Sequence, residues 1–147
     1  MWEVFKYVGP AGHFTLSKWR KNRLFLGTWT WLVPLYNQII AWLRNDTQEI
    51  YRLIFGARFK KDLYYIERYE ALKKTYAHNF DYTLTVSRED ADDVIHKGYV
   101  TDFISKDIIN QFDQYYICWA PAMIESCIRK LSDYWVSQEN IFFEKYF

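Results

Sequence analysis

Glycine is scarce in this chain. Only 5 of its 147 residues are glycine, whereas the usual share is roughly 7%. Cysteine is scarcer still, and the two thiols, Cys118 and Cys127, give neither a disulfide framework nor the spacing of a metal site. Two such thiols fit a reducing compartment, so we expect a cytoplasmic protein with no bound metal.

No charge sign dominates, and no apolar run is long. The 19 basic and 18 acidic residues give a net charge of +1, so the chain lacks the basic surface that attracts a protein to nucleic acid. The most apolar stretch, residues 24–43, is interrupted by Pro34, Asn37 and Gln38, and no basic region precedes an apolar run at the N-terminus. We expect no nucleic-acid partner, no membrane span and no signal peptide.

Short apolar runs alternate with longer segments of helical period from residue 24 onward. This alternation is typical of repeated βα units around a parallel sheet, and the length suits one domain of ordinary size. The predicted strands are residues 23–27, 50–56, 80–87, 115–118 and 140–144. The predicted helices begin near Pro34 and then span residues 60–76, 101–110 and 122–134. Residues 1–16 fit no such unit, so we expect the chain to be a fragment of a longer protein.

The first candidate site is the strand-to-helix turn at residues 24–31. A helix N-terminus offers free N–H groups and a partial positive charge, and the hydroxyls of Thr28 and Thr30 add donors, so a pyrophosphate fits there. Such a loop normally needs glycine for the tight turn and for close approach of the backbone, yet Trp29 and Trp31 stand in it. From the residues alone, a turn with two large apolar core side chains is the favoured interpretation.

The second candidate site is residues 115–123, again a strand that runs into a helix start. Ligands of open α/β sheets bind outside the carboxyl ends of the strands, so the two turns together predict one crevice. Cys118 ends this strand. It is either a buried small apolar residue or a functional thiol at the crevice.

Arginines at strand ends are the third feature. Arg58 and Arg88 follow the second and third predicted strands, with Ser87 beside Arg88, and guanidinium groups there suit the capture of a phosphate. The three histidines are too far apart for ligand spacing, and we interpret the acidic residues 89–93 as a solvated loop and not as a metal site.

In this order, the segments resemble the ferredoxin-NADP reductase superfamily of flavoproteins. Residues 27–34 are similar to its nucleotide loop G-T-G-T-G-[IL]-x-P, and residues 118–123 to its C-G-x-P-x-M signature beside the nicotinamide. Further similarity lies in residues 9–14 (the end of the flavin-binding barrel), 55–58, 86–89 and 97–98 (the nucleotide side), and 146–147 (the terminal aromatic near the flavin).

The resemblance implies two parts: residues 1–18 as the tail of an FAD-binding barrel, and residues 19–147 as an NAD(P)-binding domain. The second part would be a Rossmann-like five-stranded parallel sheet with helices on both faces, and Cys118 would border the nicotinamide as the catalytic residue. The implied nucleotide contacts are Gly27, Thr28, Trp29, Thr30, Trp31, Arg58, Ser87, Arg88, Trp119, Ala120, Pro121 and Met123. The implied flavin contacts are Gly9, Pro10, Gly12, His13, Phe14, Thr15, Tyr146 and Phe147.

The implied reaction is hydride transfer between nicotinamide C4 and flavin N5, for which this domain supplies binding and orientation. Electrons would pass to ferredoxin, flavodoxin or another redox protein, and FAD would be held mostly by an N-terminal domain outside the chain, without which the chain is inactive. Ser87 and Arg88 favour the 2′-phosphate of NADP slightly, whereas Tyr99 and the Gly-Ala-Arg segment also suit NAD. The alternative is a catalytically silent electron-transfer or interaction subunit that keeps the fold.

Tryptophan is as abundant as glycine is rare. The 7 tryptophans and 5 glycines together equal an ordinary glycine content, and every tryptophan stands where the family has or accepts glycine. Trp29, Trp31 and Trp119 replace motif glycines, Trp135 replaces a glycine expected after a helix, and Trp2, Trp19 and Trp42 occupy turn-like places. We hypothesise that the source reads UGA codons as glycine. The alternative takes the letters literally, as a domain whose phosphate loop is filled by indoles.

Overall fold

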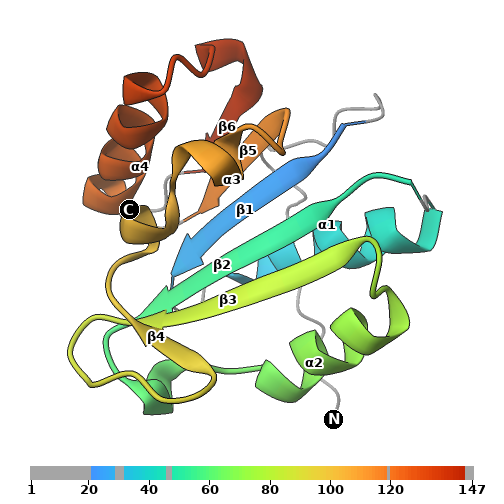
Figure 1. Cartoon of the computed structure of the whole chain (residues 1–147), viewed down its shortest axis with the longest axis vertical. Helices are drawn as coiled ribbons and strands as arrows, with labels where there is room; N and C mark the ends of the chain where they lie inside the picture. Colours follow the sequence, from blue (N-terminus) through green and yellow to red (C-terminus); the bar gives the residue numbers. More distant parts are fainter. Residues whose placement is uncertain (1–20, 29–31, 46–47, 119, 145–147) are drawn as a thin grey trace, which may run out of the picture.

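The computed structural model of the chain describes residues 21–28, 32–45, 48–118 and 120–144. Six parallel strands form one sheet, in the order β4-β3-β2-β1-β5-β6 (Figure 1). The strands are β1 (Arg23–Thr28), β2 (Tyr51–Ala57), β3 (Phe80–Val86), β4 (Ile95–Lys97), β5 (Gln114–Cys118) and β6 (Ile141–Glu144). The α/β class and the five predicted strands are confirmed. The sixth, β4, was not predicted because it has three residues and only Ile95 is buried.

Helices cover both faces of the sheet, as predicted (Figure 1). Successive residues of a strand point to opposite faces. Phe25 accordingly belongs to the core beneath α1 (Leu32–Asn45) and α2 (Ile66–Thr75). Leu24 and Leu26 belong to the core beneath η3 (Val100–Phe103), α3 (Lys106–Ile109) and α4 (Pro121–Asp133). Among the described helices, none has both the length and the apolarity that crossing a membrane requires.

Two helix predictions were wrong in extent. Residues 60–76 form a short 3-10 helix, η2 (Lys60–Asp62), and then α2, because Leu63 turns into the core and Tyr65 adopts a left-handed backbone with φ of 61°. Residues 101–110 are divided between η3 and α3, since buried Ile104 ends the first and the Ser105 hydroxyl accepts the Ile108 N–H at the start of the second. Another 3-10 helix, η4 (Gln138–Asn140), precedes β6.

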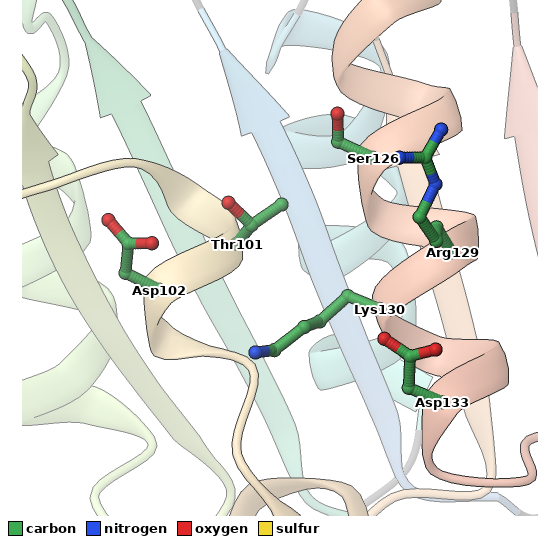
Figure 2. Close-up of a pocket in the computed structure, with 6 residues that line it drawn as sticks. All are labelled: Thr101, Asp102, Ser126, Arg129, Lys130 and Asp133. Atoms are coloured by element: carbon green, nitrogen blue, oxygen red, sulfur yellow. The ribbon is translucent and has the colours of Figure 1, made fainter.

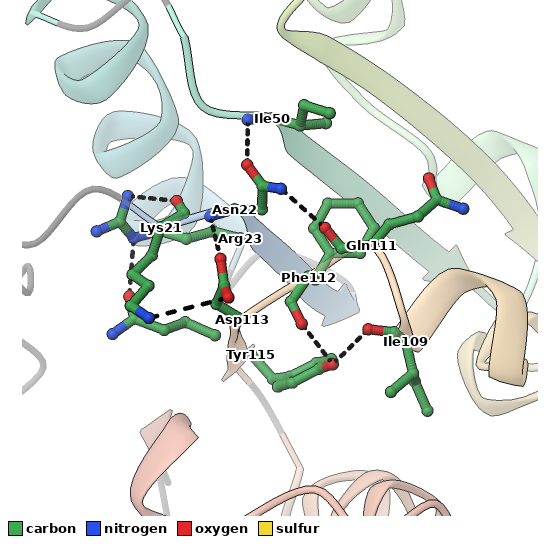
Figure 3. Close-up of polar contacts among 10 residues, drawn as sticks. Lys21, Asn22, Arg23, Ile50, Ile109, Gln111, Phe112, Asp113 and Tyr115 are labelled. Carbon is green, nitrogen blue, oxygen red and sulfur yellow. Dashed lines mark hydrogen bonds and ion pairs between the residues drawn. The ribbon is translucent and has the colours of Figure 1, made fainter.

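Polar contacts fix the amino ends of the central strands (Figure 3). Asn22 lies just before β1. Its backbone N–H donates to the Asp113 carboxylate at 2.9 Å, and its side-chain amide donates to the Gln111 carbonyl at 3.0 Å. Its side-chain oxygen accepts the Ile50 N–H at 2.9 Å. One residue therefore ties together the segments that precede β1, β2 and β5 at the amino edge of the sheet.

Trp42 does not occupy a turn, so that expectation was wrong. It lies within α1 on the side that faces the sheet, where its ring stacks on Tyr51 at 5.9 Å and lies 5.7 Å from Phe25. The guanidinium of Arg23 lies 4.0 Å from its ring centre. Helical periodicity explains the placement, because residue 42 falls next to the buried Leu43 and one turn after the buried Ile39.

Trp135 stands at a position typical of glycine, as predicted. Its backbone φ is 64°, and 95% of its side chain is exposed. The Trp135 N–H donates to the Ser132 carbonyl at 2.9 Å and the Val136 N–H to the Leu131 carbonyl at 3.2 Å. These two bonds form the Schellman motif that ends a helix, in which glycine is the usual residue at this place.

We expect Trp135→Gly to stabilise the fold by about 1 kcal/mol, because glycine adopts a left-handed conformation without the steric cost that a Cβ atom brings. The exposed indole contributes little packing that could be lost. Thermal and urea unfolding would measure the gain. Trp135→Ala is the matched control: it removes the same indole but keeps the Cβ, so an equal gain in both variants would contradict the backbone explanation.

Candidate functional site

The carboxyl ends of β1, β2, β3 and β5 meet at one edge of the sheet. From β1 the chain runs outward through β2 and β3 to β4, and then returns to place β5 on the other side of β1. Ligands of open α/β folds bind in the crevice at such a reversal of strand order. A cleft of about 800 Å³ lies at this edge. It is lined by Thr28, Gly56, Ala57, Arg58, Phe59, Lys61, Asp62, Thr85, Ser87, Arg88, Gly98, Tyr99, Val100, Thr101, Ala120, Ala122, Met123 and Ser126.

The floor of the cleft has a glycine between two threonines. Thr28, Gly56 and Thr85 lie side by side in register on β1, β2 and β3. A Cβ atom on Gly56 would meet a Val100 methyl at 2.6 Å and the Thr85 hydroxyl at 3.1 Å, so only glycine fits there without a shift. The hydroxyl oxygens of Thr28 and Thr85 are buried and have no hydrogen-bond partner among the described residues. Buried polar atoms are rarely left unpaired, so the floor is suited to a polar ligand.

The rim of the cleft is basic. The Ser87 N–H donates to the Ala57 carbonyl at 3.1 Å and the Arg88 N–H to the Arg58 carbonyl at 3.0 Å. These bonds extend the β2–β3 pairing past the strand ends and hold the two arginines side by side, as the sequence predicted. Both side chains are exposed, and within the described ranges neither guanidinium forms an ion pair.

The resemblance placed residues 97–98 on the nucleotide side, and Gly98 and Tyr99 line the cleft next to the end of β3. Gly98, with φ of 142°, leads into Tyr99, whose side chain is 68% exposed. The Asp102 carboxylate accepts the Tyr99 N–H at 2.8 Å and so fixes this turn. Thr85 gave no signal, because its place beside Gly56 depends on strand register.

Six of the predicted nucleotide contacts line the cleft: Thr28, Arg58, Ser87, Arg88, Ala120 and Met123. Cys118, Gly27 and Pro121 do not. Cys118 is fully buried in the core beneath α1 and α2. Gly27 lies against α1, where an added Cβ would come within 2.5 Å of Leu32 Cδ1. Pro121 is exposed and begins α4, where a missing N–H costs nothing. Their contacts with a ligand remain predictions.

The other predicted contacts lie outside the described residues. For the nucleotide these are Trp29, Thr30, Trp31 and Trp119. For the flavin they are Gly9, Pro10, Gly12, His13, Phe14, Thr15, Tyr146 and Phe147.

A groove of about 210 Å³ between η3 and α4 adjoins the cleft and shares Thr101 and Ser126 with it (Figure 2). The other residues that line it are Asp102, Arg129, Lys130 and Asp133. Positive and negative side chains balance here, and Asp102 is already engaged by the Tyr99 N–H. The groove lengthens the cleft along α4 without adding a net charge.

The acidic residues 89–93 lie beside the basic rim. The Asp92 carboxylate pairs with the Lys60 ammonium at 2.7 Å, and Asp90 pairs with Lys97 at 2.7 Å. Lys60, with the N–H groups of Val94 and Ile95, lowers the pKa of Asp92 to about 2. In the part of the chain that the structure describes, no three His, Cys, Asp or Glu side chains form a group that could hold a metal ion.

The cleft therefore combines exposed guanidinium groups at its rim with unpartnered hydroxyls on its floor. This set of donors fits a phosphorylated, hydroxyl-rich molecule such as a dinucleotide. Charged hydrogen bonds from arginine to phosphate are among the stronger ones, and the threonine oxygens can both donate and accept.

Sequence comparisons agree with this description. The model of the oxidoreductase NAD-binding domain family matches residues 25–129. The chain is 32% identical to the 2-halobenzoate 1,2-dioxygenase electron transfer component of Burkholderia cepacia, over 98% of this chain and 43% of that protein. It is 27% identical to the toluate 1,2-dioxygenase electron transfer component of Pseudomonas putida, over 95% of this chain and 41% of that protein. A component of the Na(+)-translocating NADH-quinone reductase of Psychrobacter cryohalolentis is 28% identical, over 94% of this chain and 35% of that protein. The chain thus spans less than half the length of these relatives.

Solved structures share the fold. The Amycolatopsis reductase GcoB superposes with a TM-score of 0.84 at 24% identity, over 93% of this chain and 42% of that one. A ferredoxin-NADP+ reductase of Plasmodium falciparum gives a TM-score of 0.68 at 18% identity, over 92% of this chain and 58% of that one. With the family match covering most of the sheet and the cleft, the chain belongs to the oxidoreductase NAD-binding domain family.

Proposed function

We propose that this chain is the pyridine-nucleotide-binding part of a flavoprotein that passes electrons from NADH or NADPH to FAD and then to a redox protein. The observation that carries the proposal is the floor of the cleft, where the Thr28 and Thr85 hydroxyls, unpartnered among the described residues, flank Gly56 below the two rim arginines. Two relatives that share most of the chain are electron transfer components of oxygenases, which supports an oxygenase or a ferredoxin-like protein as the acceptor.

Several of the residues that line the cleft have a role in this proposal. Arg58, Ser87 and Arg88 hold the phosphates at the adenosine end, with the Tyr99 ring beside them. Thr28 and Thr85 bond the central part of the dinucleotide from below. Ala120 and Met123, which follow β5, form the wall beside the nicotinamide. Bound together, the nicotinamide and a flavin supply the hydride chemistry, and the protein supplies orientation and keeps water out.

The finer assignments concern catalysis and domain organisation. Cys118 ends the strand that leads to the nicotinamide wall, and we assign it the place behind that ring. FAD is held by an additional domain together with residues 9–15 and 146–147, so the chain by itself binds nucleotide but does not turn over. The acceptor is a ferredoxin, a flavodoxin or another redox protein, such as an oxygenase.

Arg58→Ala and Arg88→Ala should each weaken the binding of NADH and NADPH by about 10-fold or more, since a hydrogen bond to a charged group contributes about 1.5–3 kcal/mol. Fluorescence titration of the chain with glycine at positions 29, 31 and 119 would measure the dissociation constants. Arg129→Ala, in the neighbouring groove, is the control and should leave them unchanged. If neither nucleotide binds saturably, the chain is a silent subunit that keeps the fold without the site.

A further inference from the structure

The acidic residues 89–93 form contacts with some of the cationic residues around the cleft and not with others. The Glu89 carboxylate accepts the Lys60 backbone N–H, and Asp92 pairs with the Lys60 ammonium. Asp90 accepts a hydrogen bond from the Lys97 ammonium at 2.7 Å. Arg58 and Arg88 are not ion-paired with any described residue. The loop thus engages Lys60 and Lys97 and leaves the two arginines for a ligand.

Lys97 is the cation whose engagement matters most. It ends β4, next to Gly98 and Tyr99, which line the cleft, and β4 pairs with β3, the strand that Arg88 follows. Its backbone is fixed, because the following Gly98 N–H donates to the Val86 carbonyl at 2.9 Å. The flexible side chain contacts the carboxylate of Asp90, and a negative group bound at this end of the cleft would compete with that carboxylate for it.

NADH and NADPH differ by one phosphate, on the 2′ oxygen of the adenosine ribose. Resting on the proposed function, which places adenosine at Ser87, Arg88 and Tyr99, we propose that Asp90 selects against NADPH by holding Lys97 away from the 2′-phosphate. To use Lys97, the phosphate must break the ion pair. NADH has no phosphate at that position, so its binding affinity does not depend on the ion pair.

The surroundings of the pair fix the expected size of the effect. The Asp90 and Lys97 side chains are 92% and 61% exposed, so the pair competes with water and salt and is worth no more than a typical surface ion pair. The Lys97 ammonium holds the pKa of Asp90 below its usual range, so the carboxylate is charged throughout the neutral range. Glu89 and Asp92 are already bonded to Lys60 and cannot replace Asp90 at Lys97 without breaking those contacts.

The test compares NADPH with NADH on the 147-residue chain carrying glycine at positions 29, 31 and 119. Asp90→Asn should tighten NADPH binding by roughly two- to fivefold, the range expected of an exposed ion pair, and leave NADH binding unchanged. Asp93→Asn is the matched control: it removes the same charge from the same exposed loop, three residues away, at a side chain with no ion pair among the described residues. It should not alter the ratio of the two affinities.

Lys97→Met completes a double-mutant cycle. It should weaken NADPH binding alone, and Asp90→Asn should then have no further effect in that background. If Asp90→Asn and Asp93→Asn change the ratio of the two affinities equally, the selection comes from the overall charge of the loop, and the proposal is overturned. Saturable binding of both nucleotides with an unchanged ratio in every variant would overturn this inference and leave the proposed function standing. Failure of every variant to bind either nucleotide would refute both.

Discussion

Replacing Trp29, Trp31 and Trp119 together with glycine should raise the affinity of the chain for NADH or NADPH by roughly 100-fold or more. In the proposed nucleotide loop, indoles at the first two positions would compete with a pyrophosphate for space, and a bulky residue that must adopt a glycine conformation to bind it costs about 1–3 kcal/mol. A 100-fold change corresponds to about 2.7 kcal/mol, so removing such a cost from the bound state at two positions accounts for it. Titration of both chains by calorimetry or fluorescence is the measurement.

Support for this expectation comes from a tryptophan that the structure describes. Trp135 has the left-handed backbone and the Schellman hydrogen bonds of a glycine position, with its indole in solvent. Trp135→Gly should therefore change stability and not affinity, which makes it the control for the triple substitution. Trp42 behaves differently, because glycine there would remove contacts with Phe25, Tyr51 and Tyr116 and weaken α1 by about 1 kcal/mol.

The same expectation has a genetic counterpart. If the source reads UGA as glycine, all seven positions are encoded by UGA, and the intact mass of the natural protein is that of a chain with seven glycines in their place. A UGG codon at position 29 or 31 would refute recoding. Failure of the triple substitution to create a binding site would refute the nucleotide loop itself, whatever the codons are.

Elements with strong local patterns were predictable from the sequence. Five strands are runs of β-branched and aromatic residues that lie within a buried sheet, so their pattern and their environment agree. The break at residues 63–65 was not predictable, because the sequence there continues a helical pattern and only the tertiary contact of Tyr64 with Phe55 diverts it. Strand β4 depends similarly on pairing with residues 84–86.

The sequence predicted the residues of the candidate site that directly follow a strand. It did not predict features of the site that depend on contacts between residues far apart in the sequence. Arg58 and Arg88 were identified because each follows a recognisable strand, and parallel strands bring their carboxyl ends to one edge. Cys118 follows the same rule, yet its side chain points into the core, because the alternation of β5 places Tyr116 and Cys118 on the α1 face. Which face the last residue of a strand presents depends on register, which local sequence does not fix.

Raising the pH above about 10 should unfold the protein, because several phenols are held neutral by the fold. Burial raises the pKa of Tyr69, and it raises the pKa values of Tyr64 and Tyr115 to about 12. A phenol with a raised pKa gives stability that is fully present below its unfolded value near 10 and is lost as the pH rises toward the folded value. A shift of two units corresponds to at most about 2.7 kcal/mol for a fully buried group and to less for half-buried Tyr64.

A comparison of Tyr69 with Tyr115 distinguishes two contributions of a phenol to stability, its ionisation and its hydrogen bonding. Both side chains are buried, but the Tyr69 hydroxyl has no partner among the described residues. The Tyr115 hydroxyl instead lies 3.0 Å from both the Ile109 and the Phe112 carbonyl oxygens (Figure 3). Tyr69→Phe should therefore cost little at neutral pH, whereas Tyr115→Phe should cost about 1 kcal/mol, the typical net contribution of a hydrogen bond.

Both variants should lose stability less steeply than the parent chain between about pH 10 and 12, because each has one fewer phenol to ionise on unfolding. Urea unfolding followed by far-ultraviolet circular dichroism, at neutral pH and at steps up to about pH 11, gives both quantities. If Tyr69→Phe follows the parent chain at every pH, the Tyr69 hydroxyl ionises with similar ease in the folded and unfolded chain. That result would contradict the burial of the Tyr69 hydroxyl without a partner. It would also contradict the packing of the Tyr69 ring, which α2 carries, against Phe55 and Tyr36.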